Sequence, residues 1–326
     1  MPFLIGTDEA GYGPNLGPLV ISASVWEVPD GAQGDDLYEL LSKVVRPAAR
    51  PAKKQRQQSD GCIAIGDSKL LYQPGNGLAQ LERGLWALWS LLGSRPATFA
   101  DVWTLLVGPD GDSRHEGLCG GCDGTRLPLD FDPAELDGLH CGLCEAFAEA
   151  GVRLVDLRSV AIFPREFNEG TARCDSKGTA LSQWTLSLAA QLIERLPDDR
   201  IFVFCDKHGG RDYYMPLLMD CFPGPFIEVV AEGRARSVYR FGPAERRVEF
   251  SFQAKGESHL PTALASMASK YLRELAMHAF NQHWLRHLPK LQPTAGYPMD
   301  ARRFKTDIAA TQLALGIEDR ILWRTK

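Results

Sequence analysis

The chain has 326 residues, enough for one large domain with insertions or for two domains. Hydrophobic residues make up 44% and charged residues 24% of the chain, so it can build a sizeable core, which excludes disordered, collagen-like and coiled-coil proteins. Lys and Arg total 36 against 41 Asp and Glu, a formal net charge of −5, so the overall basic charge typical of many nucleic-acid-binding proteins is absent.

The sequence favours a cytoplasmic protein without membrane segments. Its longest apolar stretches, 85–92 and 201–205, are far shorter than the roughly 20 residues that cross a bilayer. The first residues, MPFLIGTDEAGYGP, contain no basic leader and place two carboxylates directly after a short apolar run. We therefore expect no cleaved signal peptide.

The hydrophobic pattern predicts alternating strands and helices. A Gly- and Pro-rich break separates the first two β-rich runs and predicts a hairpin, and the unbroken apolar run at 201–205 predicts a strand buried on both faces. In chain order, we predict strands at 3–7 and 19–26, helices at 36–44 and 78–92, a strand at 153–157, a helix at 179–196, strands at 201–205, 226–231 and 247–253, and a helix at 258–283. This order favours an α/β or α+β fold with a mixed sheet flanked by helices.

Two segments depart from this pattern and are predicted to be insertions in a core formed by residues 1–93 and 151–326. Residues 28–60 are mostly polar and form a basic insertion, which fits either a solvated loop or an arm that contacts phosphates. Residues 94–150 form the second insertion. Between 43 and 56 the first insertion has no acidic residue and six basic ones, namely Lys43, Arg46, Arg50, Lys53, Lys54 and Arg56.

Four cysteines in the second insertion form two CxxC pairs, Cys119-Gly-Gly-Cys122 and Cys141-Gly-Leu-Cys144. Four thiolates at this spacing can close a tetrahedral zinc site, and the glycines permit the tight hairpin turns that aim sulfur at the metal. The surrounding segment offers few apolar residues for a core of its own. We therefore predict a zinc-ribbon-like module in which the four cysteines hold a structural Zn²⁺, with redox chemistry or free thiols as the alternatives.

Four carboxylates stand at the ends of predicted elements. Asp8 and Glu9 follow the first strand, Asp206 ends the buried strand, and Glu257 precedes the last helix. Burying an ionised carboxylate without a partner costs several kcal/mol, and a pair of Mg²⁺ or Mn²⁺ ions would neutralise the set. Since neighbours on a strand point to opposite faces, Asp8 and Glu9 share a metal site only if the chain twists after Asp8. Singly, each carboxylate also fits a helix-dipole acid, a turn former or an exposed loop residue.

Several motifs resemble those of the type 2 ribonucleases H, the family of ribonucleases HII and HIII. The segment Asp8-Glu9-Ala10-Gly11-Tyr12-Gly13-Pro14 resembles the N-terminal signature of this family. Asp67-Ser68-Lys69 resembles its Asp-Ser-Lys segment, and Lys255-Gly256-Glu257-Ser258 resembles its fourth-carboxylate loop. Gly296-Tyr297-Pro298 is similar to its Gly-Tyr-Pro segment near the C-terminus, and the matches follow the same order along most of the chain.

The resemblance implies a ribonuclease H-like fold in which the four carboxylates bind two Mg²⁺ or Mn²⁺ ions. It implies hydrolysis of RNA paired to DNA that leaves 5′-phosphate ends. Glutamate at position 257 is similar to the HIII pattern, whereas Tyr297 is similar to HII, so the subtype stays open. The family's Gly-Arg-Gly reads Gly11-Tyr12-Gly13 here, which also leaves open whether single embedded ribonucleotides are cut.

The chemistry agrees with the residue types. Two cations about 4 Å apart supply both a deprotonated water and stabilisation of the leaving oxygen in phosphodiester hydrolysis. Selectivity for RNA requires a group that senses the 2′-hydroxyl, and the backbone of the turn Gly11–Gly13 is the candidate, with Tyr12 within it. Lys69 could hold a phosphate or be a solvated lysine, and Tyr297 could stack on a sugar or base or be an ordinary half-buried tyrosine. After Asp206, the segment 207–211 could meet phosphate, with a mobile histidine, His208, assisting proton transfer or product release.

We therefore predict a metal-dependent endoribonuclease whose partners are RNA/DNA hybrids or ribonucleotide-containing duplex DNA. Two alternatives remain. One is a related nuclease that acts on DNA or structured RNA, and the other is a ribonuclease H-like nucleic-acid-binding module whose insertions and altered turn have displaced catalysis.

Overall fold

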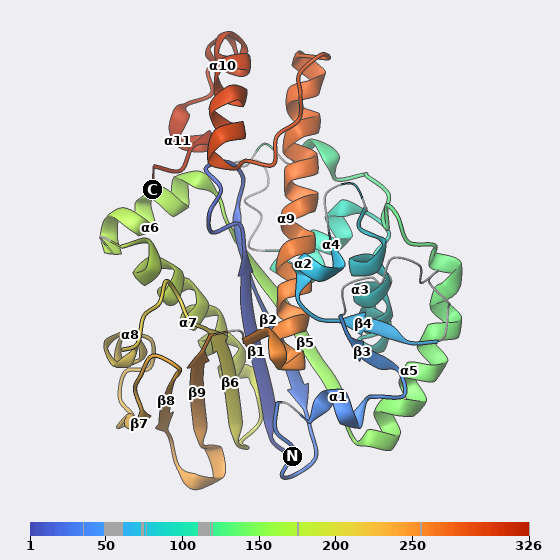
Figure 1. Cartoon of the computed structure of the whole chain (residues 1–326), viewed down its shortest axis with the longest axis vertical. Coiled ribbons are helices and arrows are strands. Elements are labelled where there is room, and N and C mark those ends of the chain that lie inside the picture. Colours follow the sequence, from blue (N-terminus) through green and yellow to red (C-terminus); the bar gives the residue numbers. More distant parts are fainter. Residues whose placement is uncertain are drawn as a thin grey trace.

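The computed structural model describes residues 1–34, 36–48, 61–72, 75, 77–109, 118, 120–174, 176–254 and 256–325. In this part of the chain, one seven-stranded mixed sheet has the strand order β5-β2-β1-β6-β9-β8-β7, with helices on both sides (Figure 1). The predicted architecture, a mixed sheet flanked by helices, is confirmed.

The centre of the sheet is the predicted hairpin joined to two parallel strands. β1 and β2 are antiparallel, β1 is parallel to β6, and β6 is parallel to β9. The sequence did not predict β8, because the charged Arg236 and Arg240 interrupt its apolar pattern. The strands are β1 (Phe3–Ala10), β2 (Leu19–Glu27), β5 (Arg153–Ile162), β6 (Ile201–Asp206), β7 (Glu228–Ala231), β8 (Arg236–Phe241) and β9 (Val248–Gln253).

Helices pack on both faces of the sheet, and each face has its own hydrophobic core. The core on one face contains residues of α3, α4, α5 and α9, and the core on the other face contains residues of α7 and α8. The predicted helices at 78–92, 179–196 and 258–283 correspond to α3, α7 and α9, whereas the one at 36–44 shortens to α1. The helices are α1 (Leu37–Leu40), α2 (Ser68–Leu71), α3 (Ala79–Leu91), α4 (Phe99–Val107), α5 (Leu136–Ala150), α6 (Pro164–Cys174), α7 (Lys177–Arg195), α8 (Met215–Cys221), α9 (Leu260–His287), α10 (Pro298–Ala314) and α11 (Asp319–Leu322).

Strand β1 contributes to both cores because its side chains alternate between faces. Leu4 belongs to the core on the α9 side, whereas Phe3 and Ile5 belong to the core on the α7 side. The face on which a residue of β1 lies therefore follows from its position in this alternation.

Part of the predicted basic insertion at 28–60 is built into the protein core. Leu37 and Leu41 are buried, and β3 (Val45–Pro47) pairs in parallel with β4 (Ile63–Ile65). Lys43 forms an exposed ion pair with Glu149 of α5. The basic residues Arg50, Lys53, Lys54 and Arg56 lie outside the described residues.

The hairpin predicted for the second CxxC pair is wrong. Cys141 and Cys144 lie inside helix α5, because an apolar stripe with helical spacing that includes Leu139 and Leu143 packs into the same core as α3 and α9. Cys122 lies in a 3₁₀ turn, Gly120–Cys122, at hydrogen-bonding distance from Arg286 of α9. The structure therefore does not show a separate zinc-ribbon-like module built on four cysteines. Cys119, the fourth predicted ligand, is not among the described residues.

Helix α9 runs along the central strands (Figure 1). The start of this helix packs directly against the backbone of β1 at Gly6. A Cβ atom at Gly6 would lie 2.1 Å from the carbonyl carbon of Pro261 and from the amide nitrogen of Thr262. Only a glycine allows this contact between two backbones, and it fixes the start of α9 beside β1.

Replacing Gly6 by Ala should destabilise the protein by at least about 3 kcal/mol, because the new methyl group meets the backbone rather than a flexible side chain. Urea unfolding measures the change. The matched control is Gly138→Ala in α5, where a Cβ meets nothing within 4 Å. We expect the control to be neutral or to stabilise the helix by up to about 1 kcal/mol. Equal stabilities of the two variants would contradict the close contact.

Within the described residues, none of the helices combines the length and hydropathy that a membrane crossing requires.

Candidate active site

Asp8 and Asp206 end up beside each other on neighbouring parallel strands. The register of β1 against β6 pairs Thr7 with Cys205, so the two aspartates are the next residues along their strands. Neighbouring strands lie about 4.8 Å apart, and residues in register share one face. Asp8 is only 8% exposed. Two carboxylates that are distant in sequence thus meet at one edge of the sheet.

The turn that contains Glu257 packs on Asp206. The 3₁₀ turn Gly256–Ser258 connects β9 to α9, and the Gly256 N–H donates to Asp206 Oδ1 at 3.4 Å. A Cβ at Gly256 would lie 3.4 Å from the Asp206 nitrogen, so the backbones are close. The backbone of Glu257 therefore lies next to the aspartate pair, while its side chain lies outside the described part of the structure.

Glu9 does not share the face of Asp8. A metal site shared by Asp8 and Glu9 would require a twist after Asp8, but β1 continues in regular pairing through Ala10. Alternation then directs Glu9 to the α7 side of the sheet. The structure therefore brings together Asp8, Asp206 and the Glu257 turn, and places Glu9 on the opposite face.

The aspartate pair offers a donor set that suits a hard divalent cation. Carboxylate oxygens are the ligands that Mg²⁺ and Mn²⁺ prefer. Among the side chains that the structure describes, no three His, Cys, Asp or Glu residues gather closely enough to hold a metal ion. The described residues therefore supply two carboxylates of the predicted set.

Two buried arginines that no sequence motif indicates, Arg324 and Arg273, pack against the Gly-rich turn after β1. The Arg324 guanidinium donates to the carbonyl oxygens of Gly11, Pro14 (3.3 Å) and Gly17 (2.6 Å) and stacks over the Phe167 ring at 4.6 Å. Gly11 has a φ of +87°, and a Cβ there would lie 2.4 Å from Arg273 Nε. Burial lowers the pKa of both guanidinium groups.

Tyr12 in this turn faces Lys177, the first residue of helix α7. Lys177 Nζ lies 4.4 Å from the centroid of the Tyr12 ring, and burial lowers the pKa of this lysine. Ser176 caps this helix, since its Oγ accepts the Thr179 N–H at 3.3 Å. Gly13 is exposed and leaves open space. The turn therefore presents a glycine backbone beside a tyrosine–lysine pair.

Lys69 lies in helix α2, and helix α9 is hydrogen-bonded both to α2 and to Asp8. Ser266 Oγ donates to Ser68 Oγ at 3.0 Å, and Ser269, one helical turn later, donates to the Asp8 carbonyl at 2.9 Å. Lys69 itself is exposed. This placement agrees with a phosphate contact near Asp8 and equally with a solvated lysine.

Tyr297 lies beside the Gly-rich turn and is 54% exposed. The Gly296 carbonyl accepts the N–H groups of Asn15 (2.8 Å) and Leu16 (3.3 Å), which follow the turn. The Gly-Tyr-Pro segment is thus docked against the N-terminal motif, although the two are nearly 300 residues apart in the sequence.

The prediction of a mobile histidine after Asp206 is wrong. His208 is 3% exposed, its Nδ1 is 2.9 Å from Ser182 Oγ, and its backbone N–H donates to the Tyr214 hydroxyl. Burial lowers its pKa to about 4. Lys207 is also engaged, with Asp212 and with the Gly233 carbonyl. The histidine is therefore a neutral core residue.

Comparison with known proteins finds similarity only at the level of structure. No protein-family model and no curated protein matches the sequence. Among solved structures, the ribonuclease HII of Archaeoglobus fulgidus, in a complex with PCNA, is 14% identical, with a TM-score of 0.41 over 99% of this chain and 94% of that one. Ribonuclease H2 of Pyrococcus horikoshii OT3 is 16% identical, with a TM-score of 0.40 over 98% and 92%.

A third similar structure is Bst-RNase HIII in complex with Mn²⁺, which is 13% identical, with a TM-score of 0.41. The match covers 99% of this chain and 65% of that one. These three structures are of a ribonuclease HII, a ribonuclease H2 and a ribonuclease HIII.

Proposed function

We propose that the protein is a metal-dependent endoribonuclease that hydrolyses the RNA strand of RNA/DNA hybrids or of ribonucleotide-containing duplex DNA. One observation carries the proposal. Asp8 and Asp206 lie side by side on adjacent parallel strands and on one face of the sheet, and the turn that bears Glu257 is hydrogen-bonded to Asp206. Bringing carboxylates this close together costs free energy unless cations neutralise their charges.

Asp8, Asp206 and Glu257 would hold the Mg²⁺ or Mn²⁺ ions. Bound there, the two cations would activate a water molecule near neutral pH and stabilise the leaving oxygen. Glu9 completes the ligand set that the resemblance implies, and its place on the other face of β1 requires the end of the strand to twist when metal binds.

The chain's own groups would orient the substrate. The backbone of Gly11–Gly13 can approach a 2′-hydroxyl closely, because no Cβ stands in the way at Gly13. Tyr297 lies on the same side of the molecule as this turn and offers an exposed ring for stacking. Lys69 is the candidate phosphate contact near Asp8.

A cleavage panel tests the function. The substrates are an RNA/DNA hybrid, a DNA duplex with one ribonucleotide, double-stranded RNA and double-stranded DNA, each with Mg²⁺, Mn²⁺ or EDTA. We expect cleavage of the hybrid with 5′-phosphate products and none in EDTA. The single-ribonucleotide duplex separates an HII-like from an HIII-like preference. Equal cleavage of double-stranded DNA or RNA would favour a different nuclease, and binding of the hybrid without any cleavage would favour a binding module.

A further inference from the structure

A cavity of about 460 Å³ lies next to the Gly-rich turn and is not used by the proposed reaction. It is bounded by α10, α11 and residues 323–325. In Figure 1, these two helices lie at the top of the view, near the C-terminus. Its lining is rich in groups that donate hydrogen bonds or carry positive charge. These include Asn15, Asn168, Arg302, Trp323 and Arg324. Lys305 also lines the cavity, but it is ion-paired at 3.0 Å with Asp319, a carboxylate of the same lining.

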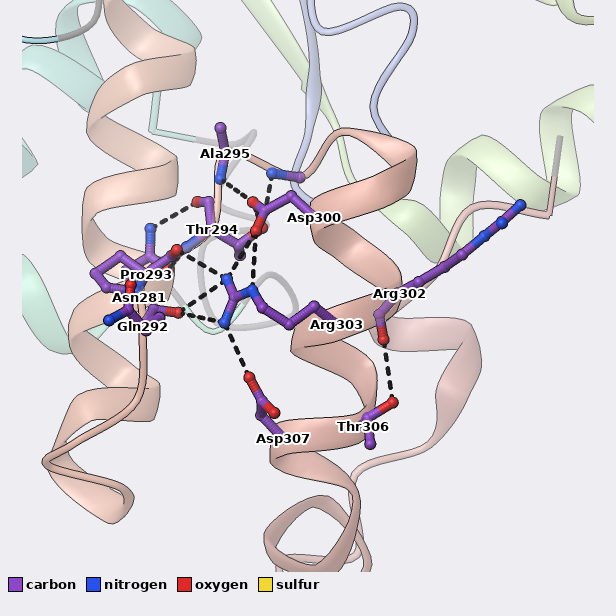
Figure 2. A network of polar contacts seen from close by, with 11 residues as sticks. Asn281, Gln292, Pro293, Thr294, Ala295, Asp300, Arg302, Arg303, Thr306 and Asp307 are labelled. Atoms are coloured by element: carbon purple, nitrogen blue, oxygen red, sulfur yellow. Dashed lines mark hydrogen bonds and ion pairs between the residues drawn. The ribbon is translucent and has the colours of Figure 1, made fainter.

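Arg302 supplies an available positive charge to this cavity. Figure 2 shows its side chain pointing away from the network around Arg303. Arg303 is fully engaged, with Asp300 at 2.7 Å, with Asp307 at 2.9 Å and with backbone carbonyls. By contrast, Arg302 is exposed, and no carboxylate within the described residues pairs with its guanidinium. Since the neighbouring arginine satisfies the acids of α10, the charge of Arg302 remains free for a ligand.

A second arginine, Arg324, also lines the cavity. Arg324 is 3% exposed, and its terminal nitrogens donate to the carbonyls of the Gly-rich turn. Its Nε is buried and finds no acceptor among the described residues. Leaving a charged donor buried without an acceptor is unfavourable, which favours an anionic or strongly accepting group nearby.

The cavity is continuous with the candidate substrate turn. Arg324 lines the cavity and holds the carbonyls of Gly11 and Gly17, and the Arg324 N–H donates to the Asn15 carbonyl at 3.0 Å. A nucleic-acid strand advances by only about 3.4 Å per nucleotide along the helix axis. A strand that contacts Gly11–Gly13 therefore carries further phosphates within reach of this cavity.

We propose that this cavity binds a phosphate of the nucleic-acid backbone that flanks the position contacted by the Gly-rich turn. The inference rests on the proposed function. Arg302 supplies a guanidinium, which binds phosphate oxygens through paired N–H groups. The Nδ2 groups of Asn15 and Asn168 each donate one N–H to a backbone carbonyl, of Arg324 at 3.4 Å and of Trp323 at 2.7 Å, and each has a second N–H of the kind that commonly contacts phosphates. The contact positions the duplex without reading its sequence.

The test measures binding of a fluorescent RNA/DNA hybrid by anisotropy at several salt concentrations, in EDTA so that no hydrolysis occurs. Arg302→Ala should weaken binding roughly tenfold. It should also reduce the slope of log K against log salt by about 0.9, the value for one lost phosphate contact. The control is Arg195→Ala, an exposed arginine at the far end of α7, which should change neither quantity.

Two results would overturn the inference. If both arginine variants lose affinity equally, the effect is one of net charge and not of this cavity. If the hybrid binds Arg302→Ala normally while adenosine monophosphate or inorganic phosphate binds the unmodified protein and not the variant, the cavity serves a small ligand. The cleavage panel and the binding test can fail separately. A protein that cleaves no substrate, but whose salt dependence of binding changes in Arg302→Ala, overturns only the proposed function. An active protein without the salt effect overturns only this inference.

Discussion

Asp206→Asn should lower the rate of hybrid cleavage at least about 1000-fold, which corresponds to about 4 kcal/mol in the activation barrier. Asparagine has the same shape and keeps Oδ1 as an acceptor for the Gly256 N–H, so the turn that carries Glu257 should stay in place. The change removes the negative charge that neutralises a bound cation. Single-turnover rates with saturating Mg²⁺ or Mn²⁺ measure the effect, and anisotropy in EDTA should show hybrid affinity within about twofold of the unmodified protein.

The matched control is Asp220→Asn, which makes the same change at an exposed position of α8. It should leave both rate and affinity unchanged. Full activity of Asp206→Asn would remove Asp206 from the site and, with it, the observation on which the proposed function depends. Equal losses in rate and in affinity would instead indicate that Asp206 positions the duplex.

The meeting of Asp8, Asp206 and the Glu257 turn could be anticipated because it follows from sheet topology. Runs such as 3–7 and 201–205 are recognisable as strands from their apolar residues alone. Once β1 and β6 lie parallel, residues at their carboxyl ends must gather at the same edge. Alternation along a strand also predicts that the side chains of Asp8 and Glu9 point to opposite faces. The structure agrees, since β1 continues in regular pairing where a shared metal site would need a twist.

Features that depend on tertiary packing could not be anticipated in the same way. The glycines of Cys141-Gly-Leu-Cys144 suggested tight turns, but the burial of Leu139 and Leu143 against α3 and α9 favours a helix. In the sequence, nothing distinguishes Arg324 from the other charged residues near it. Its role is visible only when residues 323–325 fold back on the turn at 11–17.

Glu82 is another such residue, and Glu82→Ala should destabilise the protein by about 4 kcal/mol or more. The carboxylate is fully buried in α3 and accepts the backbone N–H groups of Leu129 (2.7 Å), Asp130 (2.7 Å) and Phe131 (3.0 Å) and the Tyr271 hydroxyl (2.9 Å). Each buried donor left unpaired costs roughly 1–3 kcal/mol. Because typical domains are stable by only 5–15 kcal/mol, urea unfolding should show a much lower midpoint.

Two further variants separate the loss of these hydrogen bonds from the change of residue type. Glu145→Ala makes the same substitution at an exposed position of α5 and should shift stability by no more than about 0.5 kcal/mol. Tyr271→Phe removes one of the four donors, so Glu82→Ala should cost less in that background than in the unmodified protein, because one fewer polar group is stranded. Identical costs in the two backgrounds would mean that Tyr271 does not share the carboxylate, and a near-neutral Glu82→Ala would contradict the whole arrangement.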